Sequence, residues 1–450
     1  MYTVQRDINT DTQISLFYDK SLMNLKDLQK KYNLSDLELF SQDTSTHKVS
    51  FTANKLKQTE STHTSGNALR LIKNKRLGFA ATHGKSNLEK MLNKALETSK
   101  FSSEIDFKLP GKIQKIEEVK INKESLSSFI EKGKELIEEI LYQIPNVLTD
   151  ISFEVTNSKE TIKNTKDLNY SYSKELYSFL INIRETLEND FFDIYTAVID
   201  DRFPDYRTYA SELVQYYKLS KKHLKIKNGI FPVLFTSKAT KELLEVLELA
   251  LNGKQINQKS SPWHNMLGKQ ITSKLITIKQ DPLFGYMTRS IDDEGSVIKP
   301  LTFINHGTLE NFYFDLSSAC RCELQPIPTA GNGFKPSLSS QPEPTPLNMI
   351  ISAGLRPINQ IIKDINYGLL IDQTMGGLST NISGDMSVNV DVGFLIERGE
   401  ITGRVKDTMV TGNIYSAFNN ILELSNNLKQ HWSHIYSPDM LIDGFTITSK

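Results

Sequence analysis

The 450-residue chain has only two cysteines, Cys320 and Cys322, which are separated by a single residue. Two thiols cannot build a disulfide framework, and a zinc site formed around them would need two further ligands. The motifs HExxH, GxSxG and CxxC are also missing. From these absences alone, no catalytic machinery can be identified in the chain.

The chain also lacks an excess of charge and any long apolar run. It carries 53 basic and 53 acidic residues, and this balance argues against a dedicated binder of nucleic acid or of anionic membranes. No apolar stretch approaches the roughly 18 residues that a bilayer requires, and the first residues show no apolar core of a signal peptide. We therefore expect a cytoplasmic protein that binds neither nucleic acid nor membrane.

The clearest pattern that is present lies in "NISGDMSVNVDVGFLIERGE", residues 381–400. Every second residue from Met386 to Ile396 is apolar, and the residues between them are mostly small or polar. A period of two predicts one strand of eleven residues, roughly 37 Å long, with a single buried face. The "ERGE" sequence that follows predicts a tight turn.

Proline and glycine residues near 110 and near 230 predict two domain boundaries. We therefore expect three domains, 1–105, 106–224 and 225–450. The first should contain a helix, strands, a hairpin turning at 73–75 and a second helix. The middle domain should combine a helix over 125–144 and another near 205–220 with β-rich segments. The third should consist mainly of long strands joined by short turns. The fold class expected is α+β, with mixed N-terminal blocks and a large antiparallel β-rich C-terminal domain.

Two histidines, His431 and His434, stand three residues apart and would share one face of a helix. They could be metal ligands, but no carboxylate stands beside either one. We favour a helix end packed around Trp432. On a strand, Cys320 and Cys322 would likewise face the same side, too far apart for an easy disulfide.

Four segments of the chain resemble the signatures of the TldD/PmbA family, proteins associated with peptide maturation and proteolysis. They are "SGNALRLIKNKRLGFAATHG" (65–84), the block that starts with "DDEGSVIKP" (292–321), "TAGNGFKP" (329–336) and the block from "ISGDMSV" to "TGN" (382–413). The resemblance implies the β-rich C-terminal domain of that family. It also implies positions that line a peptide cavity or maintain a structural motif: Asp292, Asp293, Glu294, Gly295, Gly331, Asn332, Gly333, Gly384, Gly412 and Asn413.

The family contains a catalytic kind of chain, in which an HExxxH helix and a cysteine near the C-terminus hold zinc. The matching stretch in this sequence, 236–253, contains no histidine, and the C-terminal end contains no cysteine. The chain therefore resembles the PmbA/TldE kind, which lacks the zinc ligands. The resemblance implies no metal or other cofactor in this chain, and zinc only in a partner. That partner would be a TldD-like zinc peptidase subunit or a second copy, and the pair would enclose an unfolded peptide.

Two other functions remain open at this point. The chain could be a self-associating scaffold that binds peptides without cleaving them. It could also be a peptidase with an unrecognised site, in which Asp292, Asp293 and Glu294 bind a metal or act as a base. A run of carboxylates before a glycine is more often a solvated turn, and we prefer that interpretation of the run.

Overall fold

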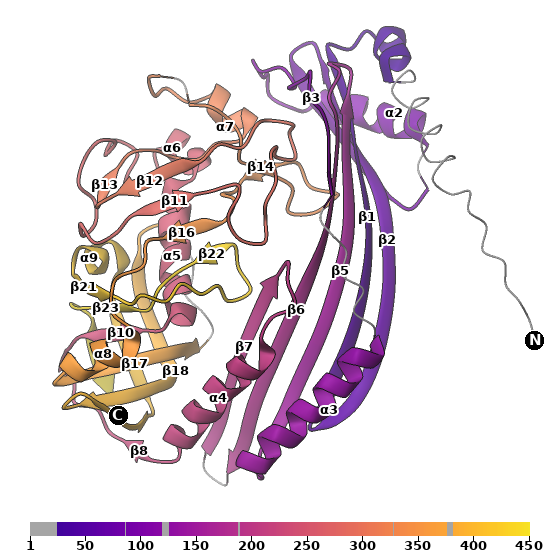
Figure 1. The fold of residues 1–450 in the computed structure, drawn as a ribbon. Coiled ribbons are helices and arrows are strands. Elements are labelled where there is room, and N and C mark those ends of the chain that lie inside the picture. Colours follow the sequence, from indigo (N-terminus) through magenta and orange to yellow (C-terminus); the bar gives the residue numbers. More distant parts are fainter. Residues whose placement is uncertain (1–24, 86, 119–125, 188–189, 327, 376–380) are drawn as a thin grey trace, which may run out of the picture.

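A computed structural model describes residues 25–450, apart from residues 86, 119–125, 188–189, 327 and 376–380. Long curved strands from the N-terminal half form one side of the molecule, and the β-rich C-terminal half lies beside them (Figure 1). The expected α+β class is confirmed. No described helix is long and apolar enough to span a membrane.

The N-terminal half is built on a seven-stranded sheet. Its order is β3-β2-β1-β5-β6, and β4 and β7 both pair with β6, which β4 joins as a parallel neighbour. The strands are β1 (Asp36–Thr52), β2 (Lys55–Lys73), β3 (Arg76–His83), β4 (Gln114–Glu118), β5 (Leu148–Asn164), β6 (Asn169–Leu187) and β7 (Asp190–Asp200).

Tight turns join the first three strands of this sheet. Ala53 and Asn54 connect β1 to β2, and Asn74 and Lys75 connect β2 to β3, all with positive φ angles. Two consecutive left-handed residues give the turn that matches the twist of paired strands, and asparagine tolerates this conformation. The predicted hairpin at 73–75 is therefore confirmed.

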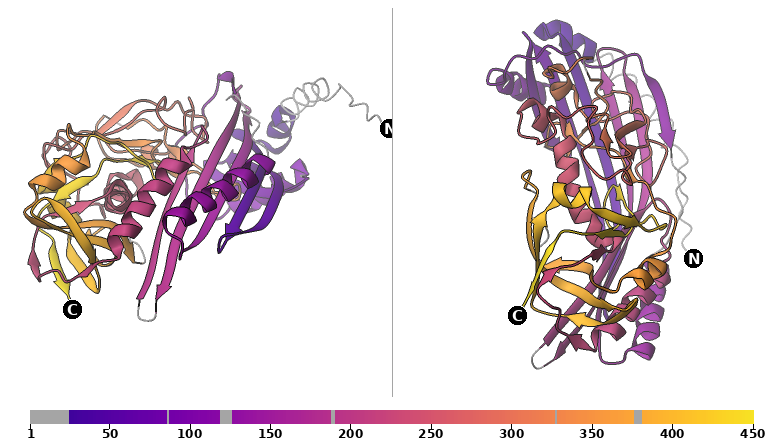
Figure 2. Two further views of the ribbon diagram at one scale, coloured as in Figure 1. Left: turned by 60° about the horizontal axis from the view of Figure 1, so that its bottom comes forward. Right: turned by 90° about the vertical axis from the view of Figure 1, so that its left-hand side faces the viewer.

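Helices cover this sheet at its two ends. Residues 25–32 are helical and pack with α2 (Leu88–Ser99) near one end, where Asn87 caps α2 by accepting a hydrogen bond from the N–H of Lys90. At the other end, α3 (Leu126–Gln143) and α4 (Tyr206–Ser220) lie side by side against the strands (Figure 2). These helices confirm the sequence-based expectation, because each presents its periodic apolar residues to the sheet.

The C-terminal half contains two larger sheets and a small one. The ten-stranded sheet comprises β8 (His223–Leu224), β9 (Gly229–Ile230), β10 (Val233–Phe235), β17 (Tyr367–Met375), β18 (Asp385–Glu397), β19 (Glu400–Val405), β20 (Thr408–Asn413), β21 (Ile421–Leu424), β23 (Met440–Ile442) and β24 (Thr446–Ser449). The five-stranded sheet comprises β11 (Ile278–Gln280), β12 (Leu301–Asn305), β13 (Thr308–Leu309), β16 (Met349–Ile351) and β22 (Ile435–Tyr436), and the small one β14 (Gly333–Phe334) and β15 (Glu343–Pro344).

Helices of this half connect and cover the sheets. They are α5 (Ser237–Leu251), α6 (Gly253–Asn257), α7 (Leu316–Cys320), α8 (Ile358–Asp364) and α9 (Ile414–Asn419). The apolar side chains of α5 lie in the largest core, together with residues from both larger C-terminal sheets. Helix α5 therefore occupies the interior of the C-terminal half.

Strand β18 confirms the predicted long strand. Buried and exposed residues alternate from Asp385 to Val390, as the period of two requires. From Val392 to Ile396 both faces are buried, so the predicted single buried face holds only for the first part of the strand. Val392, Phe394 and Ile396 pack in the core that also contains residues of α3 and α4. Tyr216 of α4 stacks on Phe394 there, with ring centroids 5.4 Å apart.

Several details differ from the expectation. The longest strands lie in the N-terminal sheet, whereas most C-terminal strands have two to six residues, so "long strands" describes only β17 and β18 there. Residues 431–434 form no helix, and Trp432 is 45% exposed with φ +47°. Cys320 ends the short helix α7 rather than lying on a strand, and both thiols are free. The three domain boundaries remain a prediction; strands from the first two expected domains, β1 and β5, pair within one sheet.

Candidate functional site

The acidic run that the sequence singled out is buried. Asp292, Asp293 and Glu294 are 0%, 6% and 2% exposed. The preferred interpretation of a solvated turn is therefore wrong. Charged groups can be buried at this depth only where hydrogen bonds and opposite charges replace water.

Arg70 provides the main compensation for Glu294. This arginine comes from β2, and its guanidinium donates to Glu38 of β1 and to Glu294, each at 2.8 Å. The second oxygen of Glu294 accepts a hydrogen bond from the backbone N–H of Leu316 at 2.6 Å. Burial raises the pKa of Glu294 to about 7, although Arg70 opposes the rise. The triad ties the N-terminal sheet to the C-terminal half.

The neighbouring aspartates are held mainly by backbone groups. Asp292 accepts hydrogen bonds from the N–H groups of Glu294, Ser296 and Gly333 at 2.8–3.0 Å. Burial raises the pKa of Asp292, and the charge of Glu294 adds to the rise. Asp293 forms an ion pair with Arg289 at 2.9 Å.

The Gly331–Gly333 segment completes this arrangement. The N–H of Asp293 donates to the carbonyl of Gly333, and the amide of Asn332 donates to Gln280 at 2.6 Å. A Cβ on Gly333 would lie 2.3 Å from a carboxylate oxygen of Glu294, so the position requires glycine. Gly295, with φ +83°, closes the acidic turn. The structure therefore brings Asp292–Gly295 and Gly331–Gly333 together as a buried polar network that we call the interdomain lock.

The other three predicted positions form a separate turn before and beside β18. The amide of Asn413 donates to the carbonyl of Ser383 and to Asp385, and its oxygen caps α9 through Ser416. Gly384 has φ +76°, and Gly412 lies under the ring of Phe445, where a Cβ would be 2.7 Å from the ring. These contacts define how β18 and β20 begin and end. No hydrogen bond described here joins them to the interdomain lock.

Helix α5 contacts both histidines that the sequence analysis considered, one near each end of the helix. Thr236 caps the helix, Ser237 Oγ lies 3.0 Å from His431 Nε2, and Glu248 lies 3.0 Å from His434 Nε2. Burial and nearby lysines lower the pKa of His431 to about 3. Burial also opposes protonation of His434, but the Glu248 carboxylate outweighs it and raises the pKa.

Comparison with known proteins identifies the family. A model described as "PmbA/TldA metallopeptidase C-terminal domain" matches residues 228–449, and one described as "PmbA/TldA metallopeptidase domain 1" matches residues 37–99. Together they cover well over half of the chain. The chain belongs to the PmbA/TldD family.

Individual PmbA/TldD relatives are distant. A metalloprotease TldD homolog of Buchnera aphidicola is 28% identical over 49% of this chain and 46% of its own length. The metalloprotease PmbA of Escherichia coli is 27% identical over 47% of this chain and 46% of its own. These alignments span about half the length of the relatives. The crystal structure of TldE from Thermococcus kodakarensis superposes with a TM-score of 0.86 at 22% identity, covering 95% of this chain and 99% of that one, which shows a shared fold.

The resemblance to the family implies that a catalytic chain carries two zinc-binding histidines on the helix that corresponds to α5. In this chain, the charged side chains of α5 are lysines and glutamates. Lys238 forms an ion pair with Asp372 at 2.5 Å, and Glu242 accepts a hydrogen bond from Thr374 at 2.6 Å. Among the residues that the structure describes, no three His, Cys, Asp or Glu side chains are grouped to hold a metal ion.

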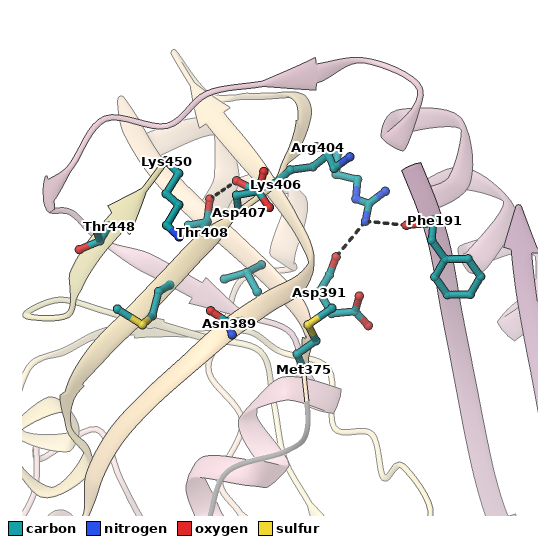
Figure 3. A pocket seen from close by; sticks show the side chains of 12 residues that line it. Phe191, Met375, Asn389, Asp391, Arg404, Lys406, Asp407, Thr408, Thr448 and Lys450 are labelled. Carbon is teal, nitrogen blue, oxygen red and sulfur yellow. Dashed lines mark hydrogen bonds between the residues drawn. The ribbon is translucent and has the colours of Figure 1, made fainter. Parts of the chain in front are cut away.

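The outer edge of β7 is a feature that sequence analysis missed. Side chains of the C-terminal half donate to its backbone carbonyls: Arg404 to Phe191, Gln373 to Asp193, Lys238 to Tyr195 and Gln430 to Ile199. A cavity of about 610 Å³ lies beside this edge. Figure 3 shows how the Arg404 guanidinium at this cavity bridges the carbonyls of Phe191 and Asp391. The backbone carbonyls of a strand point alternately to its two edges. One edge of β7 pairs with β6, so the carbonyls of every second residue point to the unpaired edge, where these side chains reach them. No local motif marks these donors, so only the assembled fold reveals them.

Proposed function

We propose that this chain is a non-catalytic subunit of the PmbA/TldE kind, which pairs with a TldD-like zinc peptidase chain to cleave unfolded peptides in the cytoplasm. The composition of α5 is the observation that carries the proposal. The stretch that should hold HExxxH has no histidine, and its polar side chains bond to Asp372, Thr374, His431 and His434 instead. Zinc sites are built from Cys, His, Asp and Glu side chains, and α5 contributes neither histidine nor cysteine to such a site.

Family membership and fold add further support. The matched models describe metallopeptidase domains, and the superposed TldE shares the fold over nearly the whole chain. Within that fold, loss of the ligands removes the water-activating centre and leaves the surfaces that bind partner and substrate. The zinc would then reside in the partner, where three protein ligands and a water suffice for hydrolysis.

The test is to express this chain with the HExxxH-bearing relative from the same genome and to purify the tagged complex. We expect a stoichiometric pair that cleaves an unstructured peptide, loses activity with a chelator and regains it with zinc. The partner alone should cleave much more slowly. Equal cleavage by the partner with and without this chain would contradict the proposal. Purification of this chain only with itself would favour the self-associating scaffold.

A further inference from the structure

A second cavity, of about 700 Å³, lies between the two halves of the molecule. One side is formed by the end of β7, the turn that follows it and the first turn of α4, within residues 200–209. The other side is the loop 283–288 with Lys429 and Tyr436. Ligand sites occur preferentially at such junctions between parts of a fold. None of the predicted site residues lines it.

Aromatic side chains form the walls of this cavity: Phe203, Tyr209, Phe284 and Tyr436. Phe284 meets Tyr436 edge to face, with ring centroids 4.9 Å apart. The hydroxyl of Tyr436 accepts a hydrogen bond from the N–H of Tyr286 at 3.1 Å. Gly285 lies against the same ring, because a Cβ there would be 2.4 Å from the Tyr436 hydroxyl. These contacts hold Tyr436 in place.

The same cavity has an excess of carboxylates. Glu212 is neutralised by Lys429 at 2.6 Å, and Asp205 caps α4 by accepting hydrogen bonds from Thr208. Arg202 is 3.7 Å from Asp201, but its side chain is 90% exposed, so the pair is weak. Asp200 accepts a long hydrogen bond of 3.4 Å from the N–H of Arg202.

Among the residues that the structure describes, Asp200 and Asp201 pair with the backbone N–H and the exposed guanidinium of the adjacent Arg202. Burial raises the pKa of Asp200 to about 6, and the neighbouring carboxyl of Asp201 adds to the rise. A like charge nearby disfavours ionisation of a carboxyl, whereas a nearby cation favours it. The field of Asp200 also reaches the far wall, where it contributes to the raised pKa of Tyr436 after the larger effect of burial.

Aromatic walls and a carboxyl pair whose described ion pair is weak and exposed are complementary to an organic cation. Ring faces attract guanidinium and ammonium groups, and carboxylates supply charged hydrogen-bond acceptors. We propose that this cavity binds the guanidinium or ammonium group of an organic cation, with Asp200 and Asp201 as its counter-ions. A hard metal ion is a poorer match, because the described residues bring no three carboxylates or other ligands into one coordination shell.

The test is calorimetric titration of the full chain with N-acetyl-arginine amide and with its uncharged isostere, N-acetyl-citrulline amide. The arginine compound should bind roughly tenfold or more tightly, because a charged hydrogen bond is lost in the isostere. Asp200→Asn combined with Asp201→Asn should weaken arginine binding by about the same factor. Glu131→Gln, an exposed carboxylate on α3, is the matched control and should leave binding unchanged.

A parallel titration with spermidine distinguishes a free polyamine from a basic peptide side chain. Whichever of spermidine and N-acetyl-arginine amide binds more tightly indicates which kind of cation the cavity accepts. Phe284→Ala tests the aromatic wall independently and should weaken binding even if the double variant fails to fold. Equal affinity for arginine and citrulline amides, or wild-type affinity in both variants, would overturn the proposal. Because the chain is titrated alone, the outcome is independent of whether it pairs with a peptidase subunit.

Discussion

The tripeptide Ile-Asp-Asp occurs twice in this chain, at 199–201 and at 291–293, with opposite structural outcomes. In the interdomain lock, both aspartates are buried and surrounded by donors. In the cavity beside α4, the carboxyls are partly exposed, and the carboxyl of Asp201 contributes to the raised pKa of Asp200 after the larger effect of burial. Identical local sequence therefore gives a buried, paired structural element in one place and a partly exposed carboxyl pair at a cavity in the other.

The difference lies in residues far away in the chain. Arg70 reaches Glu294 across a separation of 224 residues, and Gly333 supplies a backbone donor to Asp292 from 41 residues away. Within the described part of the chain, the hydrogen bond to Asp200 and the ion pair of Asp201 both come from the adjacent Arg202. Distant donors, not the acidic run itself, decide whether a carboxylate stabilises the fold or remains available to a ligand.

The largest expected effect on stability, and the strongest test of this difference between the two regions, comes from removing Arg70. Arg70→Ala would leave Glu38 and Glu294 buried without their cation, and breaking a buried ion pair costs about 3–5 kcal/mol. We expect the urea midpoint of unfolding to fall accordingly. Arg202→Ala, at the exposed arginine of the cavity, should change the free energy of unfolding by about 0.5 kcal/mol or less. Similar losses in the two variants would show that burial does not separate the two regions.

The second prediction concerns pH and Glu294. The folded pKa of about 7 lies above the ordinary value of about 4.3, so between these values the unfolded chain loses the proton first. The free energy of unfolding should therefore fall as pH rises from about 4.3 to about 7, by up to about 1.4 kcal/mol per pH unit from this group.

Glu294→Gln removes this titration. Urea unfolding at a series of pH values should show that the wild type loses stability relative to Glu294→Gln over that range, with no further change above pH 7. Glu131→Gln should keep the wild-type slope. Parallel pH profiles for the wild type and Glu294→Gln would contradict the raised pKa.

Elements with local determinants could be predicted from sequence. The alternation of Met386 to Ile396 gave β18, and the turn residues Asn74 and Lys75 placed the second hairpin, because both depend on neighbours within a few residues. The sequence motifs located the acidic run of the interdomain lock but did not predict its burial. The cation that compensates Glu294 is Arg70, which comes from the distant strand β2. The His431–Ser237 and His434–Glu248 contacts were missed because residues 431–434 form no helix and meet α5 only in the folded chain.

The smallest expected effect, and the sharpest contrast with the lock, is that of Asp200→Asn on stability. At pH 7.5 the change removes one of two neighbouring negative charges and supplies an amide that can donate to Asp201. Because the pair is partly exposed and screened by solvent, we expect the free energy of unfolding to stay the same or rise by up to about 1 kcal/mol. Urea unfolding beside the wild type measures it. A loss of more than about 1 kcal/mol would mean that Asp200, like the carboxylates of the lock, is held by the fold rather than left available to a cation.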